Sequence, residues 1–408
     1  MSEEFKNPNQ SMEMDDARRR PGMFIGKLGQ PALLHMATEM IGAAANAIIA
    51  AGATEVLVSL LNDGILRIED NGDPLDFLYK TSKGEYRLDV ELVHGLNAGF
   101  RSPVFPPFNE DTPTPLYPNE PIIVRALSEW FTITYRHEGD VWEERYEAGK
   151  LAGERTRVRA MVSGETEGVV VMLKPDLEVL KAIGLRFDYA EILSFIRNLA
   201  YLIPKGTFVL DDRRDNPQGE RITLHYPEGI RACLRDLNSD TGVPTLTDIW
   251  SAKSSIQQHS PEYARGVVHI EIQMVLQYIA SETSQQIIFL NNQPCMGGTA
   301  STGLIKGLQT YLTKIARDLS LIGNRERLTH ADVTSGLNVV INIAHYDPAF
   351  WNSLKRDIAN PELSSMVEQC IQNIFTVRSS QYLPRDLRRA VEHCVAVRQR
   401  RHLRLKRS

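Results

Sequence analysis

Two side chains that can move a proton lie four residues apart in the segment 31–51. In a helix, His35 and Glu39 would share one face, so the imidazole could orient the carboxylate. The apolar neighbours Met36 and Met40 predict that Glu39 is buried, and burying a carboxylate is energetically expensive unless the group has a role. We therefore expect Glu39 to act as a general acid–base and His35 to position it.

The elements around this pair follow from the residue pattern. Segment 31–51 is rich in Ala, Leu, Ile and Met and ends before Gly52, which predicts a largely buried helix. Two β-rich runs follow within VLVSLLNDGILRIED (56–70), and the Asn62-Asp63-Gly64 sequence between them predicts a hairpin. Asp70 ends the second run.

The rest of the chain predicts an α+β protein in two layered parts. A proline-rich stretch, 103–121, is not expected to form regular structure, and a second hairpin is predicted to turn at 138–140. Strands followed by helices begin again near residue 221. The predicted divisions are a flexible arm at 1–16, a first domain at 17–220, a second at 221–384 and a basic helix at 385–408.

Composition sets further limits on this chain of 408 residues. Its net charge is −5, but the segment 385–408 holds nine Lys/Arg against two acids, a net +7 that leaves −12 on the remainder. Such a tail indicates a local contact with an anion. The start has no secretory signal and no apolar run is long enough to span a membrane, so a cytoplasmic location is expected. The four cysteines form no CxxC pair, so no metal is expected.

Several stretches together resemble the amino-terminal ATPase region of the type IIA topoisomerase B subunits, the gyrase B and topoisomerase IV ParE family. The resemblance covers nearly the whole chain and implies a GHKL (Bergerat) ATP-binding-type sandwich followed by a transducer domain of the ribosomal S5 domain 2 type. It also implies a homodimer. The stretches are RRRPGMFIG (18–26), the helix with His35 and Glu39, Glu69-Asp70-Asn71-Gly72, FLNNQPCMGGT (289–299), TSGLNVVINIAHYDPAF (334–350) and Lys355.

The resemblance implies roles for some residues and the loss of others. Glu39 matches the family's catalytic glutamate, Asp70 matches its adenine-binding aspartate, and Lys355 matches its phosphate-sensing lysine. The asparagine that holds Mg²⁺ in the family is replaced by Ala43, which has no ligand atom. The predicted ligand-binding positions that differ from the family are Gly42, Ala43, Asn46, Pro74 and Val169, while Gly72 is kept.

The phosphate-binding parts also depart from the family pattern. The family's glycine-rich lid is replaced by PLYPNEPIIVRALS (115–128), which contains no glycine, and prolines supply no amide donors. Two acids, Asp73 and Asp76, stand in the loop after Asp70, where they would repel a triphosphate. A family arginine at the pocket mouth is matched here to Glu143. Mg-ATP hydrolysis, and therefore an ATP or metal cofactor, is not expected.

Two functions of different classes remain open at this point. In the first, the pocket is repurposed for an apolar small organic ligand and acid–base chemistry such as isomerisation, dehydration, cyclisation or hydrolysis in a biosynthetic pathway. In the second, the chain is a non-catalytic gyrase B paralogue that modulates a topoisomerase or contacts DNA through its basic tail. Because the chain contains no toprim or DNA-cleavage domain, strand passage is not expected from it alone.

Overall fold

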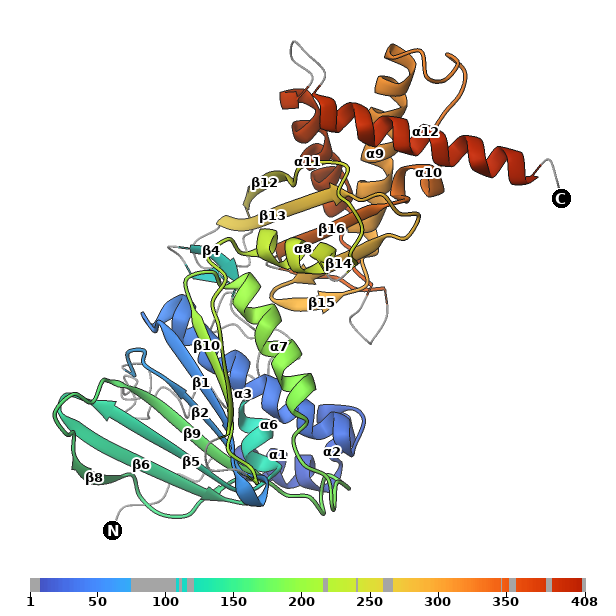
Figure 1. The fold of residues 1–408 in the computed structure, drawn as a ribbon. Coiled ribbons are helices and arrows are strands. Elements are labelled where there is room, and N and C mark those ends of the chain that lie inside the picture. Colours follow the sequence, from blue (N-terminus) through green and yellow to red (C-terminus); the bar gives the residue numbers. More distant parts are fainter. Residues whose placement is uncertain are drawn as a thin grey trace. The chain divides into compact units, whose positions relative to one another are not determined.

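The chain forms two compact units, Met1–Pro227 and Glu228–Ser408, in a computed structural model (Figure 1). Each unit is described by itself. The structure describes residues 8–74, 108–109, 112–115, 121–215, 219–239, 241–259, 267–345, 347–351, 357–378 and 384–405. The predicted α+β class is confirmed, because each unit combines one large sheet with a set of helices.

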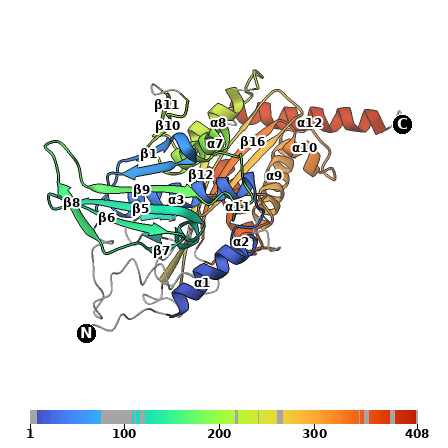
Figure 2. The same cartoon turned by 90° about the horizontal axis from the view of Figure 1, so that it is seen from below.

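The first unit is built on a nine-stranded, mostly antiparallel sheet with the strand order β11-β10-β1-β2-β9-β5-β6-β7, in which β8 pairs with β6. Figure 2 shows β1, β9, β5 and β6 running side by side. The strands are β1 (Glu55–Leu60), β2 (Leu66–Asp70), β5 (Ser128–His137), β6 (Asp140–Glu147), β7 (Lys150–Leu151), β8 (Thr156–Ala160), β9 (Gly168–Pro175), β10 (Thr207–Asp212) and β11 (Glu220–Leu224).

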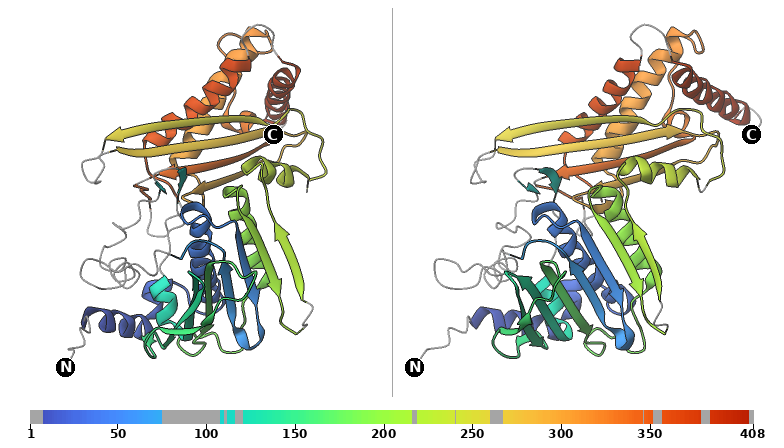
Figure 3. Two further views of the ribbon diagram at one scale, coloured as in Figure 1. Left: turned by 90° about the vertical axis from the view of Figure 1, so that its left-hand side faces the viewer. Right: turned by 60° about the vertical axis from the view of Figure 1, so that its left-hand side comes forward.

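Helices cover one face of this sheet, and Figure 3 shows α3 and α7 lying along it. The long helix α3 packs on β1 and β2, while α7 packs on β10. The helices of the unit are α1 (Pro8–Arg19), α2 (Pro21–Ile25), α3 (Gln30–Ala50), α6 (Pro121–Ala126) and α7 (Tyr189–Leu202). The packing of α3 on β2 brings the helix with His35 and Glu39 next to the strand that ends at Asp70.

Helix α3 is apolar because it is the central helix of the unit. Twelve of its 21 residues are buried, among them Leu33, Met36 and Ile41. Among the described helices, α3 is the one with the length and hydropathy to cross a membrane, and two-thirds of that stretch is buried inside the unit. Core helices of water-soluble proteins share this composition, so the predicted buried helix is confirmed.

Both predicted hairpins of the first unit form. Strands β1 and β2 pair antiparallel around the short 3-10 turn η1 (Asn62–Gly64), where Asp63 and Gly64 take left-handed backbone φ angles of 59° and 71°. Strands β5 and β6 pair around the turn at Glu138 and Gly139. The register places Asp70 opposite Val56 on β1 and opposite Val169 on β9. That register decides which residues line the end of β2.

The second unit contains a five-stranded sheet in the order β12-β13-β16-β14-β15, with helices packed around a continuous apolar core. At the centre of this core, the ring centroid of Trp250 lies 6.2 Å from that of Tyr278 and 5.7 Å from that of Phe375. The elements are α8 (Ile230–Ser239), β12 (Trp250–His259), β13 (Val267–Tyr278), β14 (Gln285–Leu290), β15 (Gln293–Cys295), α9 (Thr299–Asp318), α10 (His330–Thr334), β16 (Leu337–His345), α11 (Glu362–Arg378) and α12 (Arg385–Leu405).

Three expectations about the ends and borders are corrected. The arm at 1–16 was expected to be flexible, but the helix α1 begins at Pro8. The proline-rich stretch was expected to lack regular structure, but β3 (Phe108–Asn109) and β4 (Thr112–Pro115) pair as two short antiparallel strands. The first unit ends after Pro227 and not at residue 220, because β11 pairs with β10 and completes the first sheet.

The basic terminal helix is part of the second unit and not an appendage to it. One face of α12 is buried in the core through Leu387, Val391 and Cys394. Charged residues on its other faces pair with the unit: Arg398 contacts Glu326 at 2.8 Å. The predicted helix therefore forms, but a share of its positive charge is already neutralised within the unit.

Candidate functional site

Helix α3 presents the predicted residues along one stripe. His35, Glu39, Gly42, Ala43 and Asn46 recur at intervals of three and four residues, so they lie on one face of the helix. Glu39 is only 6% exposed and Gly42 is buried, while the other three are half-buried. The predicted burial of the Glu39 carboxylate is confirmed, and its side chain has a bonded or ionic partner.

His35 lies one turn before Glu39 on the same face of α3. Its backbone carbonyl accepts a hydrogen bond of 3.0 Å from the Thr38 hydroxyl. Burial lowers the pKa of His35, because the charged imidazolium loses hydration. The imidazole is therefore neutral at neutral pH and stands one turn from Glu39 as a separate polar group.

Asp70, at the end of β2, is the second buried carboxylate of the site. Its residue is 7% exposed, and its Oδ1 accepts a hydrogen bond of 2.9 Å from the Gly72 backbone N–H. Burial raises the pKa of Asp70 to about 6; the Gly72 N–H and the Arg136 charge oppose that rise only in part. This carboxyl group therefore changes charge close to neutral pH.

The loop after Asp70 is held in place next to α3 by hydrogen bonds and close contacts. Asn71 Oδ1 accepts hydrogen bonds from the backbone N–H groups of Thr54 and Glu55 at 2.8 and 3.0 Å, so its side chain holds the loop against β1. A Cβ on Gly72 would lie 3.1 Å from Asp70 Oδ1 and 3.2 Å from Ala47 Cβ on α3. Gly72 thus lies close to both Asp70 and α3. Pro74, two residues further on, is buried.

Strand β9 forms the third side of the site. Val169 pairs with Asp70 and is 4% exposed, so an apolar side chain stands beside the buried carboxylate. The preceding Gly168 has a φ of 148°, and a Cβ there would lie 2.1 Å from the Asp70 carbonyl oxygen. Only glycine allows this close approach of the two strands.

A half-buried ion network beside Asp70 was not predicted from the sequence. Glu69 accepts hydrogen bonds from Arg136 on β5 and from Arg67, the latter at 2.6 Å. Burial raises the pKa of Glu69, but the bonds and charges of the two arginines outweigh it and hold that pKa below its usual value. The signal was available in the alternation of β2, which places Arg67 and Glu69 on the face opposite to Asp70.

The match of the family's pocket-mouth arginine to Glu143 stays a prediction, and the structure shows where Glu143 lies. Glu143 lies on β6 opposite Thr134, and β6 is separated from β9 by β5. Arg136 pairs with Gly168 and therefore lies next to the end of β2. The strand register thus makes Arg136, and not Glu143, the charged residue at this border. Lys355 lies outside the described residues, so its predicted place at the site stays a prediction.

The sequence of this chain is similar to those of several named proteins. The family model described as DNA gyrase B matches residues 229–407. The DNA gyrase B protein of Archaeoglobus fulgidus is 25% identical over 364 residues, 88% of this chain and 53% of that protein. The B subunit of the type 2 topoisomerase of Aquifex aeolicus is 26% identical over 89% of this chain and 43% of that protein.

Over most of its length, this chain is similar to gyrase B proteins. It spans about half the length of the curated relatives that it matches. The 43K ATPase domain of Thermus thermophilus gyrase B, crystallised with an aminocoumarin, aligns with a TM-score of 0.72 and 23% identity over 97% of both chains. The topoisomerase IV ATP-binding domain of Francisella tularensis, in complex with a small-molecule inhibitor, aligns with a TM-score of 0.68 and 18% identity over 95% of this chain and 97% of that one. The predicted GHKL and transducer folds are confirmed.

Within this gyrase B-like fold, the site combines two buried carboxylates with apolar walls. The Ala43 side chain has no oxygen or nitrogen atom, so this position of α3 cannot ligate a cation through its side chain. What remains on α3 and β2 is a neutral imidazole, the Glu39 carboxylate and the Asp70 carboxyl group. These groups can accept or donate protons and hydrogen bonds next to Val169.

Proposed function

We propose that this gyrase B homologue no longer hydrolyses Mg-ATP, and that its former nucleotide pocket binds a small, largely apolar organic ligand. The observation that carries the proposal is the wall formed by α3 and β2. This wall keeps the buried carboxylates Glu39 and Asp70, yet it presents Gly42 and Ala43 where the family resemblance requires a metal ligand. A site that retains acids but loses its metal ligand favours proton transfer over phosphoryl transfer.

Magnitudes support the loss of Mg-ATP. Each lost charge-assisted contact costs about 1.5–3 kcal/mol. Here the metal ligand at Ala43 and the amide donors of a glycine-rich lid are absent together from the sequence. Even with incomplete additivity, about 5 kcal/mol corresponds to roughly a thousandfold weaker binding. Asp73 and Asp76 add negative charge to the loop after Asp70.

The retained groups have distinct roles in the proposed pocket. Asp70 anchors the polar edge of the ligand, because its buried carboxyl group sits at the end of β2 beside Val169. Glu39 accepts and returns a proton as the acid–base centre. His35, held neutral by its burial, supplies a second polar group one turn away. Isomerisation, dehydration, cyclisation and hydrolysis all use such a set, and a biosynthetic pathway is the expected setting.

The first experiment measures steady-state phosphate release by the full chain with Mg-ATP. We expect none above background. The control is a gyrase B ATPase fragment under the same conditions. Turnover comparable to that fragment, and abolished by Glu39→Ala, would contradict the proposal, because the glutamate would then be serving its ancestral reaction.

The second experiment tests the pocket with an aminocoumarin, the class of compound crystallised with the Thermus thermophilus domain. Calorimetric titration without Mg²⁺ should show binding that Asp70→Asn weakens at least about tenfold, the effect of losing one charge-assisted hydrogen bond. The matched control is Asp63→Asn, the same change in the exposed β1–β2 turn. Equal affinities for the wild type and Asp70→Asn would exclude Asp70 as the anchor.

Once a substrate is known, two variants test the proposed catalytic roles. Glu39→Gln keeps the shape of the side chain but removes the proton acceptor, so turnover should fall by about 10² or more while binding persists. His35→Ala should cost less, since it removes a group that orients Glu39 but not the proton acceptor itself. Full activity of Glu39→Gln would remove the enzyme interpretation.

A second function is supported by a different observation: the matched family model lies in the second unit, residues 229–407. A paralogue that pairs with or modulates a topoisomerase, or contacts DNA, would need that unit and its basic helix α12. Arg385, Arg388 and Arg389 are exposed near the start of α12. Addition of the chain to a gyrase supercoiling reaction tests this alternative; inhibition that is lost on replacing these arginines would favour it. A homodimer and a cytoplasmic location stay predictions.

A further inference from the structure

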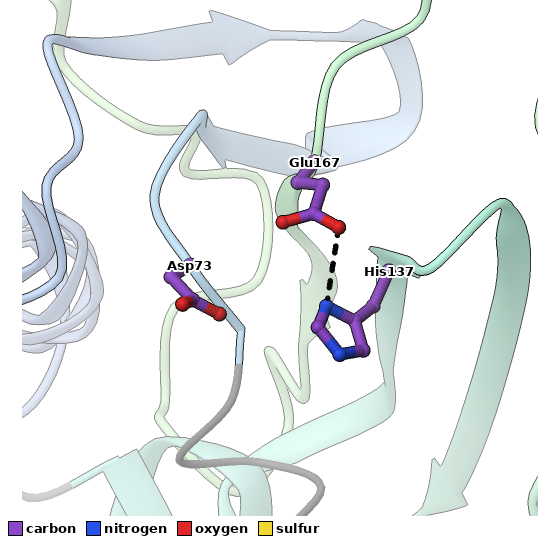
Figure 4. Close-up of side chains that lie close together, drawn as sticks. All are labelled: Asp73, His137 and Glu167. Atoms are coloured by element: carbon purple, nitrogen blue, oxygen red, sulfur yellow. Dashed lines mark ion pairs between the residues drawn. The ribbon is translucent and has the colours of Figure 1, made fainter.

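Three potential metal ligands from separate segments meet at the end of the first unit's sheet (Figure 4). Asp73 lies in the loop after β2, His137 ends β5, and Glu167 precedes β9. One ligand atom from each lies within 4.8 Å of the other two. These residues come from distant parts of the sequence, so no local spacing pattern reveals them.

The strand register explains why they meet. Arg136 on β5 pairs with Gly168 on β9, which makes the next residue on one strand, His137, a neighbour of the preceding residue on the other, Glu167. Asp70 on β2 pairs with Val169, so the loop that continues from β2 runs past the same point. The Asp73 backbone N–H donates to the Ala51 carbonyl at 2.8 Å and fixes that loop. The cluster is therefore a product of the sheet and adjoins the end of β2 that carries Asp70.

The side chain of His137 has a ring nitrogen that could bind a cation. Its side chain is 14% exposed, and its Nδ1 atom is buried without a hydrogen-bond partner although Glu167 Oε1 is 3.3 Å away. The Glu138 backbone N–H donates to Glu167 Oε1 at 3.1 Å, which orients the carboxylate as outer partners of metal ligands do. A divalent ion would satisfy the buried nitrogen and the carboxylates together.

The charges around the cluster favour a cation. Glu138 adds a third carboxylate, 3.9 Å from His137 Nε2. The neighbouring arginines are engaged elsewhere: Arg136 bonds to Glu69, and Arg159 bonds to Glu165 at 2.7 and 2.8 Å. In these contacts, more carboxylates than free cationic groups lie near the His137 imidazole. A metal ion would therefore enter a negatively charged environment.

We propose that Asp73, His137 and Glu167 bind a first-row divalent metal ion of the Zn²⁺ class at the rim of the Asp70 pocket. One imidazole nitrogen with two carboxylates suits Zn²⁺ or a neighbouring transition ion, whereas Mg²⁺ and Ca²⁺ prefer oxygen alone. Three protein ligands leave a position open for water or for a donor atom of a pocket ligand. This site differs from the lost family Mg²⁺ position at Ala43, and it departs from the sequence expectation of no metal.

Calorimetric titration of the full, untagged chain with ZnCl₂ tests the proposal. We expect one site with a dissociation constant of about 10 µM or below. His137→Gln and, separately, Glu167→Gln should each weaken it at least about tenfold, and Mg²⁺ should bind at least about a hundredfold more weakly than Zn²⁺. The matched control is His330→Gln, the same change at an exposed histidine of the second unit, which should leave the affinity unchanged.

A spectroscopic reading separates this site from stray histidine binding. Co²⁺ in the wild type should give visible d–d absorption bands of nitrogen and oxygen coordination that Glu167→Gln alters and His330→Gln does not. Circular dichroism confirms that each variant is folded. The proposal is overturned if the wild type binds no Zn²⁺ in this range, if His137→Gln binds as tightly as the wild type, or if Mg²⁺ competes on equal terms. Because the readout is metal binding, its failure leaves the proposed organic-ligand function unaffected.

Discussion

Replacing Asp70 by Asn measures how much free energy of unfolding the chain loses by burying the Asp70 charge. Burial raises the pKa of this carboxyl group from 3.8 to about 6. Between pH 3.8 and about pH 6, Asp70 is therefore protonated in the folded chain but ionised in the unfolded chain. The free energy of unfolding falls as the pH rises through this window. A shift of roughly two pKa units corresponds to about 3 kcal/mol, and the burial of Asp70 leaves little solvent screening.

The amide side chain that replaces the carboxyl group in Asp70→Asn would stay neutral at every pH, while its oxygen could still accept the Gly72 N–H. Between pH 4 and pH 7.5, the first unit of the wild type should thus lose about 2.5 kcal/mol of stability that Asp70→Asn keeps. The loss of a charged acceptor subtracts about 1 kcal/mol from the variant at high pH. Asp70→Asn should then be the more stable protein at pH 7.5 and of similar or lower stability at pH 4.

Urea unfolding at the two pH values, in EDTA, measures this difference. Because the chain has two units, pulsed hydrogen exchange of peptides from β2 and β9 should report the first unit alone. Asp63→Asn, the same substitution in an exposed turn, serves as the control and should show no pH-dependent difference from the wild type. A stability difference between Asp70→Asn and the wild type that is the same at both pH values would refute the reasoning, since it would mean that Asp70 ionises normally in the folded chain.

Gly168→Ala should destabilise the first unit by about 3 kcal/mol in thermal or urea unfolding, because its Cβ would meet a backbone oxygen at 2.1 Å; Gly164→Ala, at a positive φ with open space, should cost about 1 kcal/mol. Arg401→Ala should destabilise the second unit by about 2 kcal/mol, because it removes the 2.7 Å contact to the buried Asp332 carboxylate, whereas Arg389→Ala at an exposed position should change stability little. Sedimentation without nucleotide should give twice the 46.0 kDa chain mass, and a single species at the chain mass would contradict the predicted homodimer.

Local sequence signals were sufficient to predict those elements that depend only on residues close together in the chain. The Asp63–Gly64 turn, the buried helix around Met36 and the β5–β6 hairpin were all predictable, because turn residues and apolar periodicity act within a few positions. Borders were less predictable. β11 reads as the start of a new part, yet it pairs with β10, since pairing depends on a partner strand and not on the strand's own sequence.

The site divides in the same way. The sequence by itself determined that Glu39 is surrounded by apolar residues, that His35 shares its helix face, and that Ala43 has no atom to ligate a metal. Only the tertiary structure decided that Asp70 is buried beside Val169, that Arg136 and not Glu143 borders the end of β2, and that Asp73 approaches His137 and Glu167. The physical reason is range: helix faces follow from spacing along the chain, whereas these juxtapositions follow from the register of β2, β9 and β5.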